Sequence, residues 1–194
     1  GNMRRLGSYM EGYGDLTLPL KAPEYSKKKA MEYFARAGYR EMGEDGVLKN
    51  ERGERLVVEL TFADSSTLMT NVCSILRQEA LKCGVDLRLD PLTYNVCSRK
   101  VFEKRYQAAL WAWPLQTPFP RLYETFASEL AYDARGNPVG NTNNIFAVAD
   151  TELDAALNAE RNAPDDAALK KALHRAQKRI HELCVWIPGW REPY

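Results

Sequence analysis

Histidines and long apolar runs are scarce in this sequence. Only two histidines, His174 and His181, occur among its 194 residues. Their spacing on a predicted helix separates them by about 10 Å, which is too far to share a metal ion without other ligands. No apolar stretch approaches the roughly 20 residues that a membrane-spanning helix requires. The sequence therefore supports neither a histidine-based metal site nor a membrane span.

An excess of either charge is also missing. Lysine and arginine number 27 and aspartate and glutamate 26, so the formal net charge is +1. Proteins that bind nucleic acids or anionic membranes need basic residues in excess to neutralise phosphates. The run from Lys27 to Lys29 is a local exception, and such runs usually form a solvated helix face. We expect no nucleic-acid partner.

The sequence contains no familiar catalytic motif. A GxSxG elbow, an HExxH pair, a Walker loop and a GxGxxG loop are all absent. Two carboxylates, Glu124 and Asp154, are the candidates for a hydrolytic enzyme. A surface ion pair explains Glu124 equally well, and a carboxylate at a helix start explains Asp154. We therefore expect a protein that is not an enzyme and that uses no cofactor.

The four cysteines show neither a CxxC pair nor the spacing of a metal site. They are Cys73, Cys83, Cys97 and Cys184. We expect no metal ion and interpret these cysteines as buried, unreactive thiols. Cys184, for example, is expected beneath the terminal strand.

What the sequence does contain is an alternation of strand and helix patterns in its central part. The predicted order is a strand at 55–63, a helix at 65–84, a strand at 85–92, a helix at 94–105 and a strand at 106–113. Segments of these lengths are typical of crossover connections onto a parallel sheet. The predicted fold class is therefore α/β, a mostly parallel sheet with helices on both faces. The helix at 65–84 is expected to bury one apolar face, made of Leu68, Val72, Ile75, Leu76 and Ala80.

The flanking segments are predicted from their turn and capping residues. Residues 1–25 are broken by glycine and proline and are expected to form an extended segment, while residues 26–194 form a single α/β lobe. A helix is expected to begin after Ser26 and to end before Gly38. Further predictions are a hairpin or loop at 44–56, helices near 121–130, 150–162 and 165–184, and a short strand at 185–190.

A binding site is expected at the carboxyl ends of the central strands. Ligands of open α/β sheets gather outside this edge. The segments that follow the strands are ADSST, PLTYN and WPLQTP, which supply hydroxyls, amides and aromatic rings. Such groups suit a polar ligand that is uncharged or zwitterionic.

Several longer stretches resemble a known family. They are KKAMEYFARAGYREMGEDGVLKNERGERLVVELTF, LRQEALKCGVDLRL, FEKRYQAALWAWP and TNNIFAVADTELDAAL. Their order and spacing over residues 26–192 resemble the extracellular solute-binding proteins of family 5, the oligopeptide and dipeptide receptors of ABC importers. The stretch TPFPRLYETFAS is most similar to the branch of microcin and peptide importers.

This resemblance implies one lobe of a bilobed, type II periplasmic-binding-protein-like receptor whose second lobe is missing. Its expected ligand is a peptide or a related small solute, and its expected partner is the membrane permease of an ABC transporter. The expected location is periplasmic or extracellular. A second hypothesis remains open, in which the same lobe is the ligand-sensing domain of a transcriptional or signalling regulator. The sequence upstream of the lobe would distinguish the two.

The resemblance also implies a set of ligand-binding residues. The expected lining is Trp113, Gln116, Thr117, Asn143 and Asn144, with Trp111 beside them but largely packed. Peptide-binding family members commonly place an acid three residues beyond the strand-end tryptophan, where it holds the ligand's amino group. The matching residue here is Gln116, which can accept a hydrogen bond but cannot compensate a positive charge. Either the amine is held elsewhere, or the ligand is not an ordinary peptide with a free amine.

Overall fold

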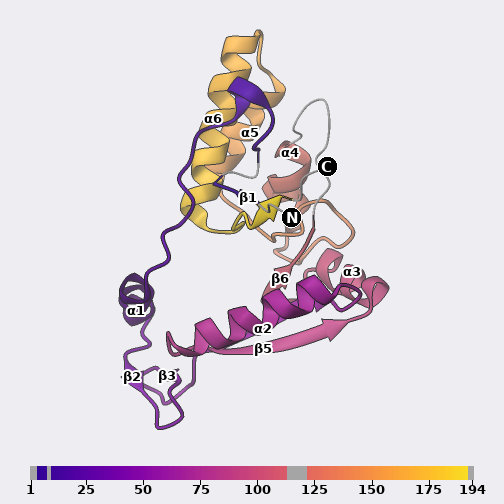
Figure 1. Cartoon of the computed structure of the whole chain (residues 1–194). Helices are drawn as coiled ribbons and strands as arrows, with labels where there is room; N and C mark the ends of the chain where they lie inside the picture. The colour runs from indigo at the N-terminus through magenta and orange to yellow at the C-terminus, as the bar shows by residue number, and fades with distance from the viewer. Residues whose placement is uncertain (1–3, 8–9, 113–121, 192–194) are drawn as a thin grey trace. The chain divides into compact units, whose positions relative to one another are not determined.

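The computed structural model describes residues 4–7, 10–112 and 122–191. The chain divides into two compact units. Unit 1 consists of Gly1–Pro23, Phe102–Lys104 and Pro114–Tyr194, and unit 2 consists of Glu24–Val101 and Arg105–Trp113. Figure 1 labels the helices and strands of both units.

Unit 2 is built on a parallel three-stranded sheet. The central strand is β4 (Val57–Ala63), with β5 (Asp86–Leu92) on one side and β6 (Ala108–Leu110) on the other. Both pairings are parallel, with Val57 opposite Asp86 and Leu60 opposite Ala108. The predicted order of strand, helix, strand, helix, strand is confirmed, and so is the α/β class with a parallel sheet.

The two faces of the sheet of unit 2 carry different side chains because successive residues of a strand point to opposite sides. On one face Leu60 and Phe62 form a small cluster with Cys73 of α2 (Thr67–Leu81). This helix runs along β5 in Figure 1. On the other face Glu59 meets Lys100 of α3 (Tyr94–Phe102). Helices therefore contact both faces, as the sequence predicts.

The apolar face predicted for α2 is only partly correct. Ile75 is 58% exposed and Leu76 is 43% exposed. The helix instead turns the stripe that contains Met69 and Cys73 toward the sheet, where Phe62 is buried. Apolar residues occur on both stripes of this helix, so periodicity alone does not decide which stripe meets the sheet.

The remainder of unit 2 precedes the sheet. Helix α1 (Lys27–Arg36) begins as predicted, with the Ser26 side chain accepting a hydrogen bond from the Lys29 N–H. It ends before Gly38, whose φ of +95° suits the residue that follows a helix. An antiparallel hairpin forms between β2 (Glu41–Met42) and β3 (Leu48–Lys49). Only its second strand lies within the segment 44–56, where a hairpin or loop is predicted.

Unit 1 is mainly helical. Its elements are β1 (Arg4–Arg5), the 3₁₀ helices η1 (Gly14–Leu16) and η2 (Ser128–Leu130), α4 (Leu122–Phe126), α5 (Thr151–Arg161), α6 (Asp166–Leu183) and β7 (Trp190–Arg191). Helices α5 and α6 lie side by side (Figure 1). They share a core of eleven buried residues, which includes Met10 from the N-terminal segment. The sequence pattern did not indicate that this segment contributes to the core.

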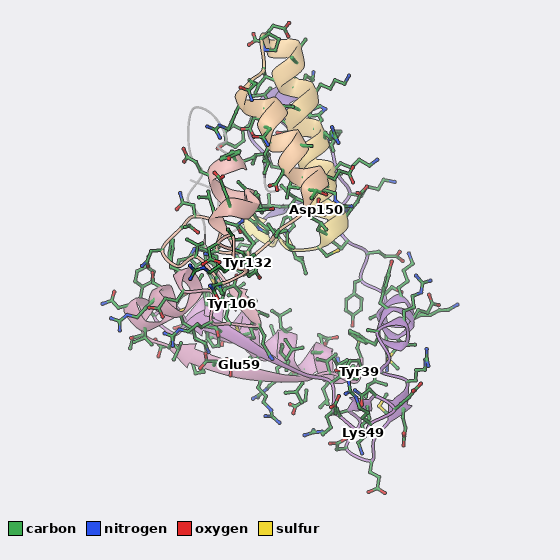
Figure 2. The ribbon with its side chains drawn as sticks, turned by 180° about the vertical axis from the view of Figure 1, so that it is seen from behind. Tyr39, Lys49, Glu59, Tyr106, Tyr132 and Asp150 are labelled. Carbon is green, nitrogen blue, oxygen red and sulfur yellow. The ribbon has the colours of Figure 1, made fainter. Side chains whose placement is uncertain are left out.

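The start of α5 is held by a charged pair. The Asp150 side chain caps the helix, because its Oδ1 accepts a hydrogen bond from the Leu153 N–H at 2.8 Å. Its Oδ2 accepts a hydrogen bond from Arg179 Nη2 of α6 at 2.6 Å. Figure 2 labels Asp150 at this position. The hydrogen bond from Arg179 is the main reason why the pKa of Asp150 lies below its ordinary value. The pair thereby links the two long helices.

The predicted strand at 185–190 is largely wrong. Only Trp190 of this segment lies in a strand, where it pairs antiparallel with Arg5. Trp186 packs instead against the core of unit 1, and Ile187 is exposed. An apolar segment can thus contribute to a core without forming a strand.

Among the described helices, none combines the length and apolar character that a membrane crossing requires.

Candidate ligand-binding site

The carboxyl ends of the three strands of unit 2 lie at one edge of the sheet, because the strands are parallel. Strand β4 ends at Ala63, β5 at Leu92 and β6 at Leu110. The Asp64 N–H donates to the Leu92 carbonyl at 3.0 Å and so ties together the segments that leave β4 and β5. This is the edge at which the sequence predicts a ligand.

Two aromatic rings meet at this edge. Tyr94, the first residue of α3, stacks with Trp111, which directly follows β6. Their ring centroids are 6.1 Å apart and their planes differ by 19°, an offset-stacked arrangement that aromatic rings favour. Since β5 and β6 flank β4, the pair spans the carboxyl end of the central strand. Trp111 is half-buried, whereas Tyr94 is 59% exposed.

Helix α3 is fixed to the sheet by an ionic network. Lys100 Nζ donates to Glu59 Oε1 at 2.6 Å and to Asp90 Oδ2 at 2.7 Å, and Thr61 Oγ1 donates to the same Asp90 oxygen at 2.9 Å. Glu59 is labelled on the sheet in Figure 2. Burial alone would raise the pKa of Asp90, but the bonds from Lys100 and Thr61 bring it below its ordinary value. The network holds the helix that carries Tyr94.

The predicted ligand-binding residues fall into three groups. Trp113, Gln116 and Thr117 lie outside the described residues. Trp111 lies at the sheet edge of unit 2 and is partly packed. Asn143 is exposed in unit 1, in the segment that precedes α5.

Asn144, in unit 1, is held inside the protein. Its side chain is fully buried, with Nδ2 donating to the carbonyls of Ala127 at 2.9 Å and Val148 at 3.2 Å. Its Oδ1 accepts from the Val148 N–H at 3.4 Å. Every polar group of this side chain is therefore engaged with the backbone. Asn144 joins two segments of unit 1 and presents no free polar atom to a ligand.

Sequence reasoning did not single out Tyr94. The residue lies in the PLTYN segment, which follows a predicted strand, but the sequence does not indicate a role for its ring. A large aromatic residue two positions after the end of a strand of a parallel sheet is the signal that points to it. Its contact with Trp111 depends on strand order, which only the structure provides.

The two carboxylates that were candidates for catalysis, Glu124 and Asp154, lie in unit 1, as does His174. Glu124 is exposed on α4, and Asp154 Oδ1 accepts from the Ser128 N–H at 3.0 Å. His174 Nε2 lies 3.1 Å from the Asp15 carbonyl oxygen. Within the part of the chain that the structure describes, no three potential metal ligands gather into a group that could hold an ion.

The cysteines differ in exposure. Cys73 and Cys97 are buried, and burial raises the pKa of Cys73 to about 11, so the predicted unreactive thiols are present at both positions. Cys184 is exposed, so its predicted burial is wrong. It occupies the C-cap of α6 with a φ of +53°, where the chain turns away from the helix and leaves the thiol at the surface.

Comparison with solved structures gives strong matches to this arrangement. The oligopeptide-binding protein AppA from Bacillus subtilis, in complex with a nonapeptide, matches 98% of this chain with a TM-score of 0.83 and 17% identity. The oligopeptide-binding protein from Thermus thermophilus, complexed with a pentapeptide, matches 98% with a TM-score of 0.80 and 17% identity. NikZ from Campylobacter jejuni, in complex with Ni(L-His), matches 97% with a TM-score of 0.73 and 21% identity.

The chain has the fold of a lobe of a periplasmic binding protein. It spans 37%, 34% and 36% of the lengths of these three proteins, which is about a third of each. No protein-family model and no curated protein matches the sequence. Two of these three proteins are oligopeptide-binding proteins, and the third is described in complex with Ni(L-His). At these identities the likeness establishes the periplasmic-binding-protein fold and leaves the ligand open.

Proposed function

We propose that this chain is a non-catalytic, solute-binding lobe of an ABC importer receptor of family 5. The observation that carries the proposal is the match of 98% of the chain to a peptide-bound receptor with a TM-score of 0.83. The sequence stretches quoted above support the same family. The regulator hypothesis has no comparable observation in its favour.

The proposed ligand is a peptide or a related small solute. Two of the similar structures hold peptides, and a third holds a nickel–histidine complex. Small-molecule sites typically combine an apolar wall with a few orienting polar groups. The exposed ring of Tyr94 and the half-buried ring of Trp111 supply such a wall at the sheet edge. Trp113, Gln116 and Thr117, which continue the chain beyond β6, are the proposed polar and aromatic contacts beside it.

The remaining parts of the proposal follow from the family. A second lobe would close over the ligand, and closure of two lobes supplies contacts that one lobe lacks. The partner would be the membrane permease of the transporter, and the location would be periplasmic or extracellular. The branch of microcin and peptide importers is the proposed subgroup.

A binding experiment tests this proposal. The protein encoded by the full open reading frame that contains this chain is titrated with pools of short peptides, and tryptophan emission and calorimetric heat are recorded. We expect saturable binding with a change in emission. The Trp113→Ala variant should bind about tenfold more weakly, equivalent to ~1.4 kcal/mol, whereas Trp190→Phe, at the terminal strand, should bind as the unaltered protein does.

Two results would contradict the proposal. One is the absence of binding by any peptide pool to a protein that is folded by circular dichroism. The other is turnover of a peptide or ester substrate that the Glu124→Gln variant abolishes, because this would indicate an enzyme.

A further inference from the structure

The first turn of α3 presents apolar surface to solvent at the ligand edge of the sheet. Tyr94 is 59% exposed and Val96 is 51% exposed, whereas Cys97 and Val101 of the same helix are fully buried. A helix that already buries one side gains nothing for its own folding from large apolar residues on the open side. Tyr94 is the exposed ring that stacks with Trp111 at the expected position of a ligand, and an exposed aromatic side chain at such a position indicates a binding surface.

The ring of Tyr94 is held in place before any ligand arrives. One contact is the stack with Trp111, at a centroid distance of 6.1 Å. The helix itself is anchored by Lys100, whose bonds to Glu59 and Asp90 fix it on the sheet. The first helical hydrogen bond runs from the Cys97 N–H to the Thr93 carbonyl at 2.9 Å, so the helix is formed from Tyr94 onward. A pre-positioned ring binds with little loss of side-chain entropy.

The chemistry of this surface favours a planar, uncharged group. Stacking between two aromatic rings needs no charge on either partner. This edge of the sheet would then favour ligands that carry an aromatic ring, which can stack on the ring of Tyr94.

We propose that Tyr94, backed by Trp111, determines specificity by stacking against an aromatic ring carried by the solute. This inference rests on the proposed solute-binding function and narrows its ligand class to peptides, or related solutes, with an aromatic side chain. Tyr94 touches the ligand directly, and Trp111 holds the tyrosine ring in the orientation that allows stacking.

Matched peptides test this proposal. The tripeptides Ala-Phe-Ala and Ala-Ala-Ala are titrated calorimetrically against the unaltered full-length protein and against Tyr94→Ala and Tyr94→Phe. A control variant is Tyr33→Ala, because Tyr33 is 65% exposed on α1 and does not lie at the sheet edge. Thermal unfolding followed by circular dichroism establishes that each variant is folded.

We expect the unaltered protein to bind the phenylalanine peptide roughly threefold to tenfold more tightly than the alanine peptide, in keeping with the strength of one aromatic stack. Tyr94→Ala should abolish this preference, so that the variant binds the two peptides with equal affinity. Tyr94→Phe and Tyr33→Ala should keep the preference, since both retain a ring at residue 94.

The outcomes separate this inference from the function on which it rests. If the unaltered protein binds both peptides equally, or if Tyr94→Ala keeps the preference, the role of Tyr94 is overturned while solute binding stands. If no peptide binds, including those of the pools, the proposed function fails and this inference fails with it.

Discussion

At the scale of single residues, the most unusual group is Glu160 on α5. One oxygen of its carboxyl is buried and has no hydrogen-bond partner among the residues that the structure describes, although the Leu122 N–H donates to the group. Burial raises the pKa of Glu160 from an ordinary 4.5 to about 7. The carboxyl is therefore protonated in the folded protein under conditions in which the unfolded chain has already released the proton.

This difference predicts a stability that depends on pH. The neutral acid stabilises the fold fully below pH 4.5, and the contribution is lost as pH rises through 7. Glu160→Gln keeps a neutral side chain at every pH, so its free energy of unfolding should gain up to about 3 kcal/mol on the unaltered protein between pH 4 and pH 8.

Urea denaturation at both pH values measures the effect. Glu32→Gln, which alters an exposed glutamate of α1, is the control and should show no such gain. Equal curves for Glu160→Gln and the unaltered protein at both pH values would mean that the carboxyl is hydrated in solution.

At the scale of elements, α2 shows how a helix is oriented by its partner. The sequence places Ile75 and Leu76 on the buried face, yet both are exposed, and the stripe with Met69 and Cys73 meets the sheet. Leu60 and Phe62 of β4 pack against this stripe. The orientation follows from how these side chains pack together, and helical periodicity is the same for either stripe.

Two substitutions distinguish the orientations. Phe62→Ala should lower the free energy of unfolding by about 3–4 kcal/mol, because the ring is buried and its loss leaves a cavity. Ile75→Ala should change it by less than about 0.5 kcal/mol, since an exposed side chain loses little. Chemical denaturation measures both changes. If Ile75→Ala lowers the free energy of unfolding by more than about 2 kcal/mol, Ile75 lies on the buried face, as the sequence predicts.

At the scale of the whole molecule, the two compact units have cores of unequal size. The described core of unit 1 joins eleven buried residues, whereas the cluster between the sheet and α2 in unit 2 joins three. Because buried apolar area is the main favourable term in folding, the smaller core gives less local stability. The proposed ligand edge lies on the unit with the smaller core.

Hydrogen exchange should reveal this difference. We expect the amides of β4 to exchange through an opening of lower free energy than the amides of α6, with Phe62→Ala widening the gap. Native-state exchange followed by mass spectrometry across a series of low denaturant concentrations measures both openings. Identical opening free energies in β4 and α6 would show that the two units unfold as one.

Local features of this protein were determined by the sequence alone. The strand patterns at β4 and β5, the Ser26 cap, Gly38 after α1 and the parallel α/β class all follow from residues a few positions apart, or from the length of a crossover. Local propensity and capping need no distant partner, so these predictions agree with the structure. The resemblance over residues 26–192 likewise anticipated the periplasmic-binding-protein fold.

Only the tertiary structure decided which side chains are open and which are enclosed. In the structure, Asn144 is buried and hydrogen-bonded to the backbone, whereas Ile75 and Cys184 are exposed. Tyr94 stacks with Trp111 across the end of β4. Each of these outcomes depends on residues far apart in the chain that meet only after the strands are ordered. Burial depends on such contacts between distant residues. For that reason the sequence predicts which edge of the sheet binds the ligand, but not that the ring of Tyr94 is exposed at that edge.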